Sequence, residues 1–257
     1  MVSIQNRIVL VTGASSGIGA ACAKAFAAEG AALILAARRK EKLEAVAAEI
    51  KEVSDTKIHL LEMDVSDRAT VEKSLSSLPK AWRDVDILVN NAGLSRGLEK
   101  LYEGDIQNWE EMIDTNVKGL LYVTRSLLPG MVKRQQGHVI NIGSIAGHQN
   151  YPGGNVYCAT KAAVRALSEA LKLDLFGTPI RVSCVDPGTV ETEFSQVRFR
   201  GDTERAEKVY QGFTPLTPDD IAEIVVFCAT RPPHVNISEL LVLTTDQSSA
   251  TMINRQS

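Results

Sequence analysis

Short apolar runs alternate along the chain with longer segments in which Ala, Leu, Glu and Lys recur. The apolar runs are rich in β-branched residues and lack regular alternation with polar residues, which predicts strands buried on both faces. We expect strands at 7–13, 31–38, 57–65, 86–93, 138–144, 180–188 and 239–244. We expect helices at 17–30, 40–53, 67–78, 105–135, 155–176 and 219–230.

This alternation of strand and helix predicts one α/β domain over residues 1–257, with a doubly wound parallel sheet. The chain contains no internal repeat, low-complexity tract or Pro/Ser-rich linker that would divide it. Three irregular stretches, 94–104, 145–154 and 189–217, follow carboxyl ends of predicted strands, where open α/β sheets bind ligands. We interpret 189–217 as a substrate lid.

A glycine-rich turn, TGASSGIG (12–19), follows the first predicted strand and opens the first predicted helix. Gly13 permits a tight turn, Gly17 lets the backbone approach a pyrophosphate, and Gly19 lets the helix pack closely on the sheet. A helix N-terminus then attracts the anion. The position between strand and helix favours a dinucleotide site over a plain turn. The cofactor contacts expected here are Gly13, Ser15, Ser16, Gly17, Ile18 and Gly19.

The end of the second predicted strand indicates which dinucleotide binds. An acidic residue there would hold the ribose 2′-hydroxyl of NAD, whereas arginine suits the 2′-phosphate of NADP. The chain has Arg38 and Arg39 and no carboxylate before Glu41. We infer NADP, with Arg38 as the first candidate and Arg39 as the second. A solvated basic helix start is the alternative.

The ends of the third and fourth predicted strands complete the expected cofactor site. Asp64 and Val65 are placed to meet the adenine edge. Asn90, Asn91 and Gly93 are expected to line the adenosine–ribose side.

The stretch from Asn141 to Lys161 carries the candidate chemistry. Tyr157 and Lys161 are four residues apart in a predicted helix and so share one face, and Ser144 precedes Tyr157 by thirteen residues. A free tyrosine has a pKa of about 10, and lowering it to ~7 requires roughly 4 kcal/mol. A nearby cation and a charged nicotinamide could supply it. Taken alone, however, these three residue types also occur at such spacings without function.

Composition narrows the class of protein. Hydrophobic content of 44%, charged content of 23% and a net charge of −3 are ordinary for a globular protein and favour neither nucleic acid nor an anionic membrane as partner. The four cysteines form no CxxC pair, and the four histidines share no metal-ligand spacing, so we expect free thiols and no metal. Without a signal pattern or an 18-residue apolar run, the chain reads as cytoplasmic.

Taken together, these motifs resemble the short-chain dehydrogenase/reductase family over essentially the full chain. TGASSGIG matches the family's cofactor loop, NNAG (90–93) its fourth-strand motif, and YCATK (157–161) its Tyr-x-x-x-Lys motif. The resemblance implies a single Rossmann-type domain with a seven-stranded parallel sheet, and hydride transfer to or from a nicotinamide.

The resemblance also implies roles for individual residues. Tyr157 would be the general acid/base, Lys161 would lower its pKa and bind the ribose, and Ser144 would orient the substrate. Asn116, in the TNVKG stretch, would hold a water in a proton relay. The segment around the nicotinamide would include Pro187, Gly188, Val190 and Thr192.

Within the family, several stretches look like the NADP-dependent 3-hydroxy acid dehydrogenases, which are also described as L-allo-threonine or serine dehydrogenases. These stretches are 34–44, 190–202, 206–212 and 216–223. The likeness implies oxidation of small 3-hydroxy acids, or reduction of the matching semialdehydes, by a homotetramer whose polar tail, 244–257, wraps over a neighbouring subunit. The alternatives are a reductase of other ketones or aldehydes (3-oxoacyl, diketone or sulfoacetaldehyde substrates) and a non-catalytic NADP-binding module.

A small acid substrate requires a cation for its carboxylate. QVRFRG (196–201) places Arg198 and Arg200 in the expected lid, where one of them could form a bidentate pair with the substrate. In an extended segment, residues i and i+2 share a face, so the sequence does not distinguish them. Both could instead be solvated. Asn155, just before Tyr157, is a further candidate for substrate contact.

Overall fold

Seven parallel strands form one sheet in the computed structural model of the chain, which describes residues 2–256. The order across the sheet is β3-β2-β1-β4-β5-β6-β7, which confirms the predicted doubly wound α/β fold. The strands are β1 (Ile8–Thr12), β2 (Ala32–Ala37), β3 (Ile58–Glu62), β4 (Ile87–Asn90), β5 (His138–Ile142), β6 (Arg181–Pro187) and β7 (Glu239–Val242).

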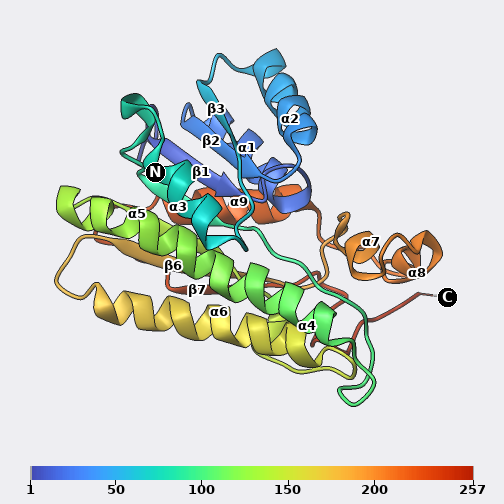
Figure 1. Cartoon of the computed structure of the whole chain (residues 1–257). Helices are drawn as coiled ribbons and strands as arrows, with labels where there is room; N and C mark the ends of the chain where they lie inside the picture. The colour runs from blue at the N-terminus through green and yellow to red at the C-terminus, as the bar shows by residue number, and fades with distance from the viewer. Residues whose placement is uncertain (1, 257) are drawn as a thin grey trace.

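Helices connect the strands and cover both faces of the sheet (Figure 1). The α-helices are α1 (Gly17–Ala28), α2 (Lys40–Val53), α3 (Arg68–Ser76), α4 (Ile106–Ile113), α5 (Leu120–Arg134), α6 (Asn155–Asp174), α7 (Phe194–Arg198), α8 (Thr203–Lys208) and α9 (Pro218–Ala229). Three shorter turns complete the set: the 3₁₀ turns η1 (Lys80–Trp82) and η3 (Ile145–Gly147), and the π-helical turn η2 (Asp114–Gly119).

Each face of the sheet has its own apolar layer. On one face, α1, α2 and α9 pack on alternate strand positions, among them Val9 and Val11 of β1. On the other face, α3, α5 and α6 pack on the positions between, among them Leu10. Because successive side chains of a strand point to opposite faces, this arrangement buries every position of a central strand and explains its uninterrupted apolar sequence.

The order of strands reverses at β1. The chain proceeds from β1 outward through β2 and β3, then crosses to the other side of β1 with β4. The loops that leave β1 and β4 therefore turn to opposite sides and leave a crevice at the carboxyl ends of these strands. The glycine-rich turn borders this crevice.

Two segments differ from the sequence-based expectation. The helix predicted at 105–135 is interrupted by the wide turn η2, which separates α4 from α5. The segment 189–217, expected to be irregular, contains α7 and α8. These two helices have five and six residues, too few for a helical period to emerge from the sequence.

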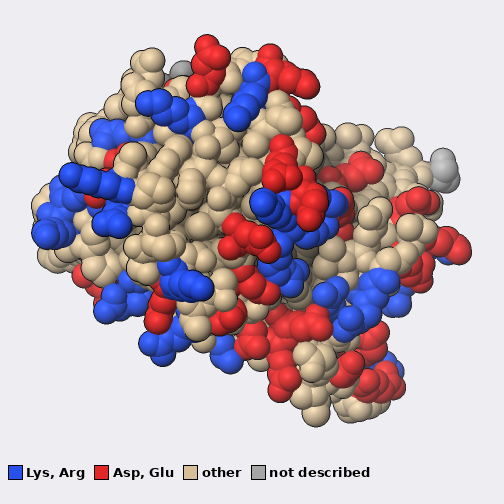
Figure 2. All heavy atoms as spheres, turned by 45° about the horizontal axis from the view of Figure 1, so that its top comes forward, with Lys and Arg blue, Asp and Glu red and all other residues tan. Residues whose placement is uncertain are grey.

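Basic and acidic side chains lie intermingled over much of the surface shown in Figure 2. Such mixing cancels the field at a distance, and the net charge of the whole chain is only −3. Separately, none of the helices within residues 2–256 has the length and apolar character that crossing a bilayer requires.

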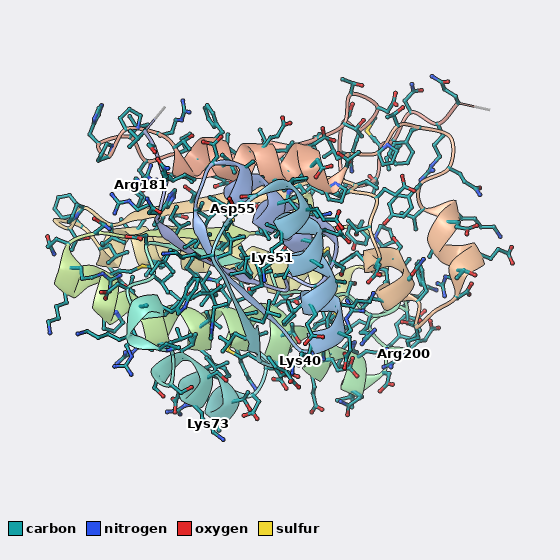
Figure 3. All side chains as sticks on the ribbon, turned by 90° about the horizontal axis from the view of Figure 1, so that it is seen from above. Lys40, Lys51, Asp55, Lys73, Arg181 and Arg200 are labelled. Carbon is teal, nitrogen blue, oxygen red and sulfur yellow. The ribbon has the colours of Figure 1, made fainter. Side chains whose placement is uncertain are left out.

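Arg181, the first residue of β6, ties the sheet to the end of α9. Its Nη2 donates to the carbonyl of Ala229 at 2.9 Å, and its Nη1 faces the carbonyl of Cys228 and two later carbonyls. These include carbonyls that the end of a helix leaves without partners, and a cation is favourable there. Figure 3 shows Arg181 far from the carboxyl-end side, where Arg200 lies.

We predict that Arg181→Lys lowers the free energy of unfolding by about 1–3 kcal/mol, because an ammonium cannot reach the same set of carbonyls as a planar guanidinium. Urea unfolding at fixed protein concentration, followed by circular dichroism, measures the change. Arg68→Lys, at an exposed pair with Glu72 on α3, is the control and should leave the midpoint unchanged. Equal midpoints for the two variants would show that the Arg181 contacts do not stabilise the fold.

Candidate active site

A cleft of about 500 Å³ opens at the carboxyl ends of the strands. Loops after β1 to β6 form its walls, together with α6 and the polar tail. The sequence-predicted residues that line it are Gly13, Ser15, Ser16, Gly17, Ile18, Arg38, Arg39, Asp64, Val65, Asn91, Gly93, Ser144, Tyr157, Lys161, Pro187, Gly188, Val190, Thr192 and Arg198. The sequence-predicted residues outside its lining are Gly19, Asn90, Asn116, Asn155 and Arg200.

The glycine-rich turn is held tightly against α1. A Cβ atom on Gly19 would come within 2.3 Å of the Gly13 carbonyl oxygen, so only glycine fits there without moving the backbone. Gly13 and Gly17 have φ values of 65° and 52°, in the left-handed region that glycine tolerates best. Gly19 therefore allows α1 to pack against the turn on the side away from the cleft, while Gly13 and Gly17 line the cleft.

The N-terminus of α1 offers its backbone N–H groups to the cleft. Its N-cap residue, Ser16, makes no side-chain capping bond. Arg39 reaches over this turn, and its Nη2 donates to Ser15 Oγ at 3.3 Å and to Ser16 Oγ at 3.2 Å. Glu193 bridges to Arg39 at 3.4 Å and to Lys42 at 2.6 Å. A cation, two hydroxyls and a free helix end suit a phosphate group.

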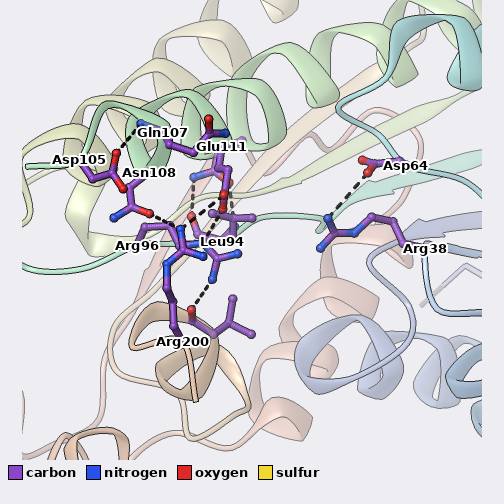
Figure 4. Close-up of polar contacts among 11 residues, drawn as sticks. Arg38, Asp64, Leu94, Arg96, Asp105, Gln107, Asn108, Glu111 and Arg200 are labelled. Atoms are coloured by element: carbon purple, nitrogen blue, oxygen red, sulfur yellow. Dashed lines mark hydrogen bonds and ion pairs between the residues drawn. The ribbon is translucent and has the colours of Figure 1, made fainter. Parts of the chain in front are cut away.

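Arg38 contacts Asp64, whereas Arg39 contacts the glycine-rich turn. Its Nη1 is 3.7 Å from Asp64 Oδ2, a contact that Figure 4 shows, and the Arg38 side chain is 64% exposed. The sequence had ranked Arg38 ahead of Arg39 as the phosphate-binding residue. In the structure Arg39 contacts the turn and Arg38 contacts the acid after β3, and both line the cleft, so the choice between them stays a prediction.

The NNAG motif (90–93) at the end of β4 has residues both in the cleft and in the core. Asn91 and Gly93 line the cleft, and Asn91 Nδ2 donates to the Thr12 carbonyl at 2.9 Å, which fixes the glycine-rich turn to β4. Asn90 is instead buried, and its Nδ2 donates to Thr124 and Asn141, each at 2.9 Å. The expectation that Asn90 lines the cofactor cleft was wrong, because its side chain joins β4 to β5 and α5.

Tyr157 lies on the buried face of α6, only 8% exposed. Burial raises the pKa of Tyr157 above its usual value, while the Arg198 guanidinium and a hydrogen bond with Ser144 act in the opposite direction. Arg198 is thus a cation that lowers this pKa, and the effect that the resemblance implies for Lys161 stays a prediction. The phenol and the Ser144 hydroxyl together can hold an oxygen atom that gains or loses a proton.

Lys161 is one helical turn beyond Tyr157 and 7% exposed. Its Nζ donates to the Ile142 carbonyl at 2.8 Å. Burial lowers the pKa of Lys161 to about 8, and the nearby Cys184 and Asp186 act against this shift. At neutral pH the ammonium form therefore predominates, and it loses its proton within a pH unit or two above neutrality.

Ser144 is positioned from its backbone. Its N–H donates to Asp186 Oδ1 at 3.1 Å, and its Oγ accepts from the N–H of Ala146 at 3.1 Å. Asp186 is fully buried at the end of β6, so β6 fixes the turn that follows β5.

Asn116 is in the π-helical turn η2 and is 2% exposed. Its side chain accepts from the Leu94 N–H at 2.8 Å and donates to the Leu94 carbonyl at 2.8 Å and to Thr160 Oγ1 at 3.0 Å. These bonds clamp the loop after β4 to α6. The side chain thus positions the wall of the cleft without lining it.

Arg198 points into the cleft from the end of α7. Its guanidinium carbon lies 5.3 Å from the centroid of the Tyr157 ring and 5.2 Å from that of Phe194, and its Nη2 donates to the Tyr151 hydroxyl at 3.0 Å. Its Nε is buried and has no hydrogen-bond partner among the residues that the structure describes. A cation with a free donor therefore lies directly beside the phenol.

Arg200 points away from the cleft. Its Nη2 donates to Asn108 Oδ1 at 2.6 Å and lies 3.5 Å from Glu111 Oε1, as Figure 4 shows. Its backbone has a φ of 51°, so the chain turns sharply after α7 instead of running extended. This turn separates Arg198 from Arg200, which the sequence could not distinguish.

Asn155 does not reach the cleft, so its predicted role in substrate contact was wrong. Its Nδ2 donates to the Glu99 carbonyl at 2.9 Å and steadies the loop before α4. Sequence reasoning missed Tyr151, Phe194 and Tyr210, which line the cleft. Tyr151 and Tyr210 lie in irregular segments and Phe194 begins the five-residue helix α7, and none of these short pieces has a sequence pattern that reveals the direction of a side chain.

The segment after β6 and the polar tail close the remaining side of the cleft. Gly188 N–H donates to the Val242 carbonyl at 2.7 Å, and Val190 forms an isolated bridge to Leu216. The described part of the tail, 244–256, folds onto its own chain, where Arg255 donates to the Val209 carbonyl at 3.0 Å. The sequence had suggested that the tail wraps over a neighbouring subunit; Ser257 lies outside the described residues.

Comparison with known proteins identifies the family. The short chain dehydrogenase family matches residues 7–202. NADP-dependent 3-hydroxy acid dehydrogenase YdfG of Escherichia coli (strain K12) is 49% identical over 251 residues, which cover 97% of this chain and 100% of the relative. Serine 3-dehydrogenase of Agrobacterium fabrum is 44% identical over 242 residues, covering 94% and 95%.

A solved structure, the closed form of serine dehydrogenase complexed with NADP+, is similar to the chain with a TM-score of 0.90. It is 48% identical in sequence, and the match covers 97% of this chain and 100% of that one. The matches in sequence and in fold agree with the family that the motifs around the cleft indicate. The chain therefore belongs to the short chain dehydrogenase family.

Proposed function

We propose that the protein is an NADP-dependent dehydrogenase that oxidises small 3-hydroxy acids, such as L-allo-threonine, serine and 3-hydroxypropionate, or reduces the matching semialdehydes. The observation that carries the substrate class is Arg198, whose guanidinium lies in the cleft beside Tyr157 with a buried, unpartnered Nε. The names of relatives that are 44% to 49% identical over nearly the whole chain support the same activity.

The residues at the adenosine end fit NADP. A Cβ on Gly17 would approach Thr192 within 3.3 Å, so the absence of a side chain keeps the narrow space between the glycine-rich turn and Thr192 free. Arg39 and the free N-terminus of α1 would hold phosphates, with Arg38 and Asp64 beside them. Val65, Asn91 and Gly93 would contact the adenosine, and Pro187, Gly188, Val190 and Thr192 the nicotinamide side.

Arg198 would receive the substrate carboxylate through a charge-assisted pair that uses its free Nε. This pair would direct the hydroxyl group of the substrate toward Ser144 and Tyr157. Holding both ends of a three-carbon acid leaves little freedom at the reacting carbon, which is how positioning lowers a barrier. The aromatic rings of Tyr151 and Phe194 would exclude water from the space around the reacting carbon.

Tyr157 would act as the general base in oxidation and as the general acid in reduction. When bound, NADP supplies the hydride acceptor, and NADPH the donor. Tyr157 in its phenolate form takes the hydroxyl proton while Ser144 donates a hydrogen bond to the same oxygen. Lys161 would bind the ribose and pass the proton toward a water near Asn116.

We further propose a cytoplasmic homotetramer in which 189–217 acts as a lid. Glu193, at the start of α7, joins this segment to α2 through Lys42 and Arg39. Exposed apolar side chains such as Leu121 on α5 and Phe227 on α9 offer surface for subunit contacts. Sedimentation velocity would test the tetramer, and a monomer at micromolar concentration would exclude it.

We predict that Tyr157→Phe lowers kcat by at least about 100-fold while NADPH affinity stays unchanged, because only the proton-transferring oxygen is lost. Initial rates with L-serine and fluorescence titration of NADPH measure the two quantities. Tyr102→Phe, at a side chain that is 78% exposed, is the control. Retained turnover in Tyr157→Phe would exclude the phenol as acid/base.

We compare kcat/KM for an acid substrate (L-serine, L-allo-threonine or 3-hydroxypropionate) with kcat/KM for a neutral secondary alcohol. We predict that Arg198→Gln lowers the ratio of the first to the second by about 10- to 100-fold. A change in the pKa of Tyr157 affects all these substrates alike and cancels in the ratio. Since Arg198 lowers that pKa, its loss should also move the rising limb of the oxidation pH profile to higher pH.

Arg200→Gln is the matched control for Arg198→Gln, because its side chain points away from the cleft. It should leave both the ratio and the pH profile unchanged. If only the neutral alcohol reacts with the unmodified enzyme, the protein is instead a reductase of neutral ketones or aldehydes. An unchanged ratio in Arg198→Gln would exclude a carboxylate clamp at this position.

We predict that Arg39→Ala raises the dissociation constant for NADPH by about 10- to 100-fold and leaves that for NADH unchanged, because the side chain would contact only the 2′-phosphate. Fluorescence titration measures both constants. Arg38→Ala should have a smaller effect, since Arg38 already faces Asp64. A larger loss in Arg38→Ala would assign the phosphate to Arg38.

A further inference from the structure

Three metal-ligating side chains from separate parts of the sequence meet beside the turn that carries Ser144. His148 follows η3, Asp186 lies near the end of β6, and Glu239 begins β7. His148 Nε2 is 3.5 Å from Asp186 Oδ2 and 3.2 Å from Glu239 Oε1. One ligand atom from each residue lies within 4.8 Å of the others.

Two atoms of this cluster are buried and find no hydrogen-bond partner within residues 2–256. The Asp186 side chain is completely inaccessible, and its Oδ1 accepts from the Ser144 N–H and from Cys184 Sγ. Its Oδ2 and His148 Nε2 face each other at 3.5 Å, and neither atom makes a hydrogen bond of good geometry to any described residue. Buried polar atoms nearly always have partners, so two unpartnered atoms at one point indicate a ligand between them.

Other charged groups around the cluster leave Asp186 Oδ2 free. Arg165 on α6 places its Nε 3.3 Å from Glu239 Oε1. A carboxylate oxygen has two lone pairs, so this contact leaves one for a second partner. Lys161 gives its hydrogen bond to the Ile142 carbonyl.

We propose that His148, Asp186 and Glu239 form a binding site for a divalent transition-metal ion of the Zn²⁺ type. Zn²⁺ binds imidazole nitrogen and carboxylate oxygen at about 2.0–2.2 Å, which places ligand atoms about 3.3–3.5 Å apart in a tetrahedral site. The distances of 3.2 and 3.5 Å from His148 Nε2 match this spacing. The fourth position belongs to water.

Charge and access also suit a cation. Two carboxylates meet at the cluster, and Arg165 at its outer edge offsets one of their two negative charges, which favours a cation there. The Glu239 side chain is 40% exposed and opens a route from solvent, whereas Asp186 is inaccessible. Asp186 Oδ1 meanwhile keeps its bond to the Ser144 backbone, so the carboxylate has a second partner that orients it.

The metal site is separate from the substrate cleft. None of its three ligands lines that cleft. The ion would fix the position of Asp186, and through it the Ser144 backbone, without taking part in proton or hydride transfer. Its role is therefore positional.

Metal binding to the full-length protein tests the proposal directly. Protein stripped with a chelator is titrated with Zn²⁺ in competition with a chromophoric chelator. We expect one equivalent of Zn²⁺, with affinity at least about tenfold weaker in His148→Ala and in Glu239→Gln. His234→Ala, at an exposed histidine, is the control and should bind like the unmodified protein.

Both test substitutions replace partly exposed side chains, and circular dichroism verifies that the variants are folded. Co²⁺ absorption then identifies the ligands. Nitrogen and oxygen ligands give visible bands alone, whereas a thiolate adds an intense near-ultraviolet band. Absence of Zn²⁺ binding, equal binding in His148→Ala, or a thiolate band from Cys184 or another cysteine would each overturn the assignment.

Discussion

The burial of Tyr157 is the constraint on which the site depends. A phenol removed from water holds its proton more tightly, so a base at this position requires compensation from its neighbours. Arg198 and the Ser144 hydroxyl supply part of it, one from the segment after β6 and the other from the turn after β5. Lys161 is subject to the same burial, which brings its pKa to about 8.

The sheet brings these groups together because parallel strands end at one edge. Loops after successive strands are neighbours in space even where they are far apart in sequence. Buried hydrogen bonds then fix each loop to the next: Asn91 to the turn after β1, Asn116 to the loop after β4, and Asp186 to the turn after β5. The polar side chains of the core thus serve mainly to hold the cleft in shape.

Strand and helix positions, the glycine-rich turn and the Tyr157–Lys161 pair could be predicted because each depends on residues close together in the sequence. Side-chain direction in irregular segments could not. Arg198 and Arg200 were treated as neighbours in an extended segment, but α7 and the sharp turn after it send them to opposite sides. Asn90 and Asn155 have polar partners in distant parts of the chain that no local pattern reveals.

The cluster of His148, Asp186 and Glu239 could not be predicted from the sequence for a related reason. Metal sites are recognised in sequence by ligands a few residues apart on one element, whereas these three come from separate elements and meet only in the folded sheet. Contacts between residues so far apart in the sequence depend on strand order and register. The sequence predicts the fold class but not the register that brings such side chains together.

The two ends of the described chain have different surroundings, with consequences for how the protein is handled. Val2 donates its N–H to the Thr230 carbonyl at the end of α9, away from the cleft (Figure 1). The tail instead lies against the cleft wall, where the Arg255 guanidinium stacks 5.0 Å from the Phe213 ring. A purification tag or a surface tether fused behind the tail would crowd the cleft and the segment that borders it. Fusion ahead of β1 keeps that side clear and is the better route to an immobilised catalyst.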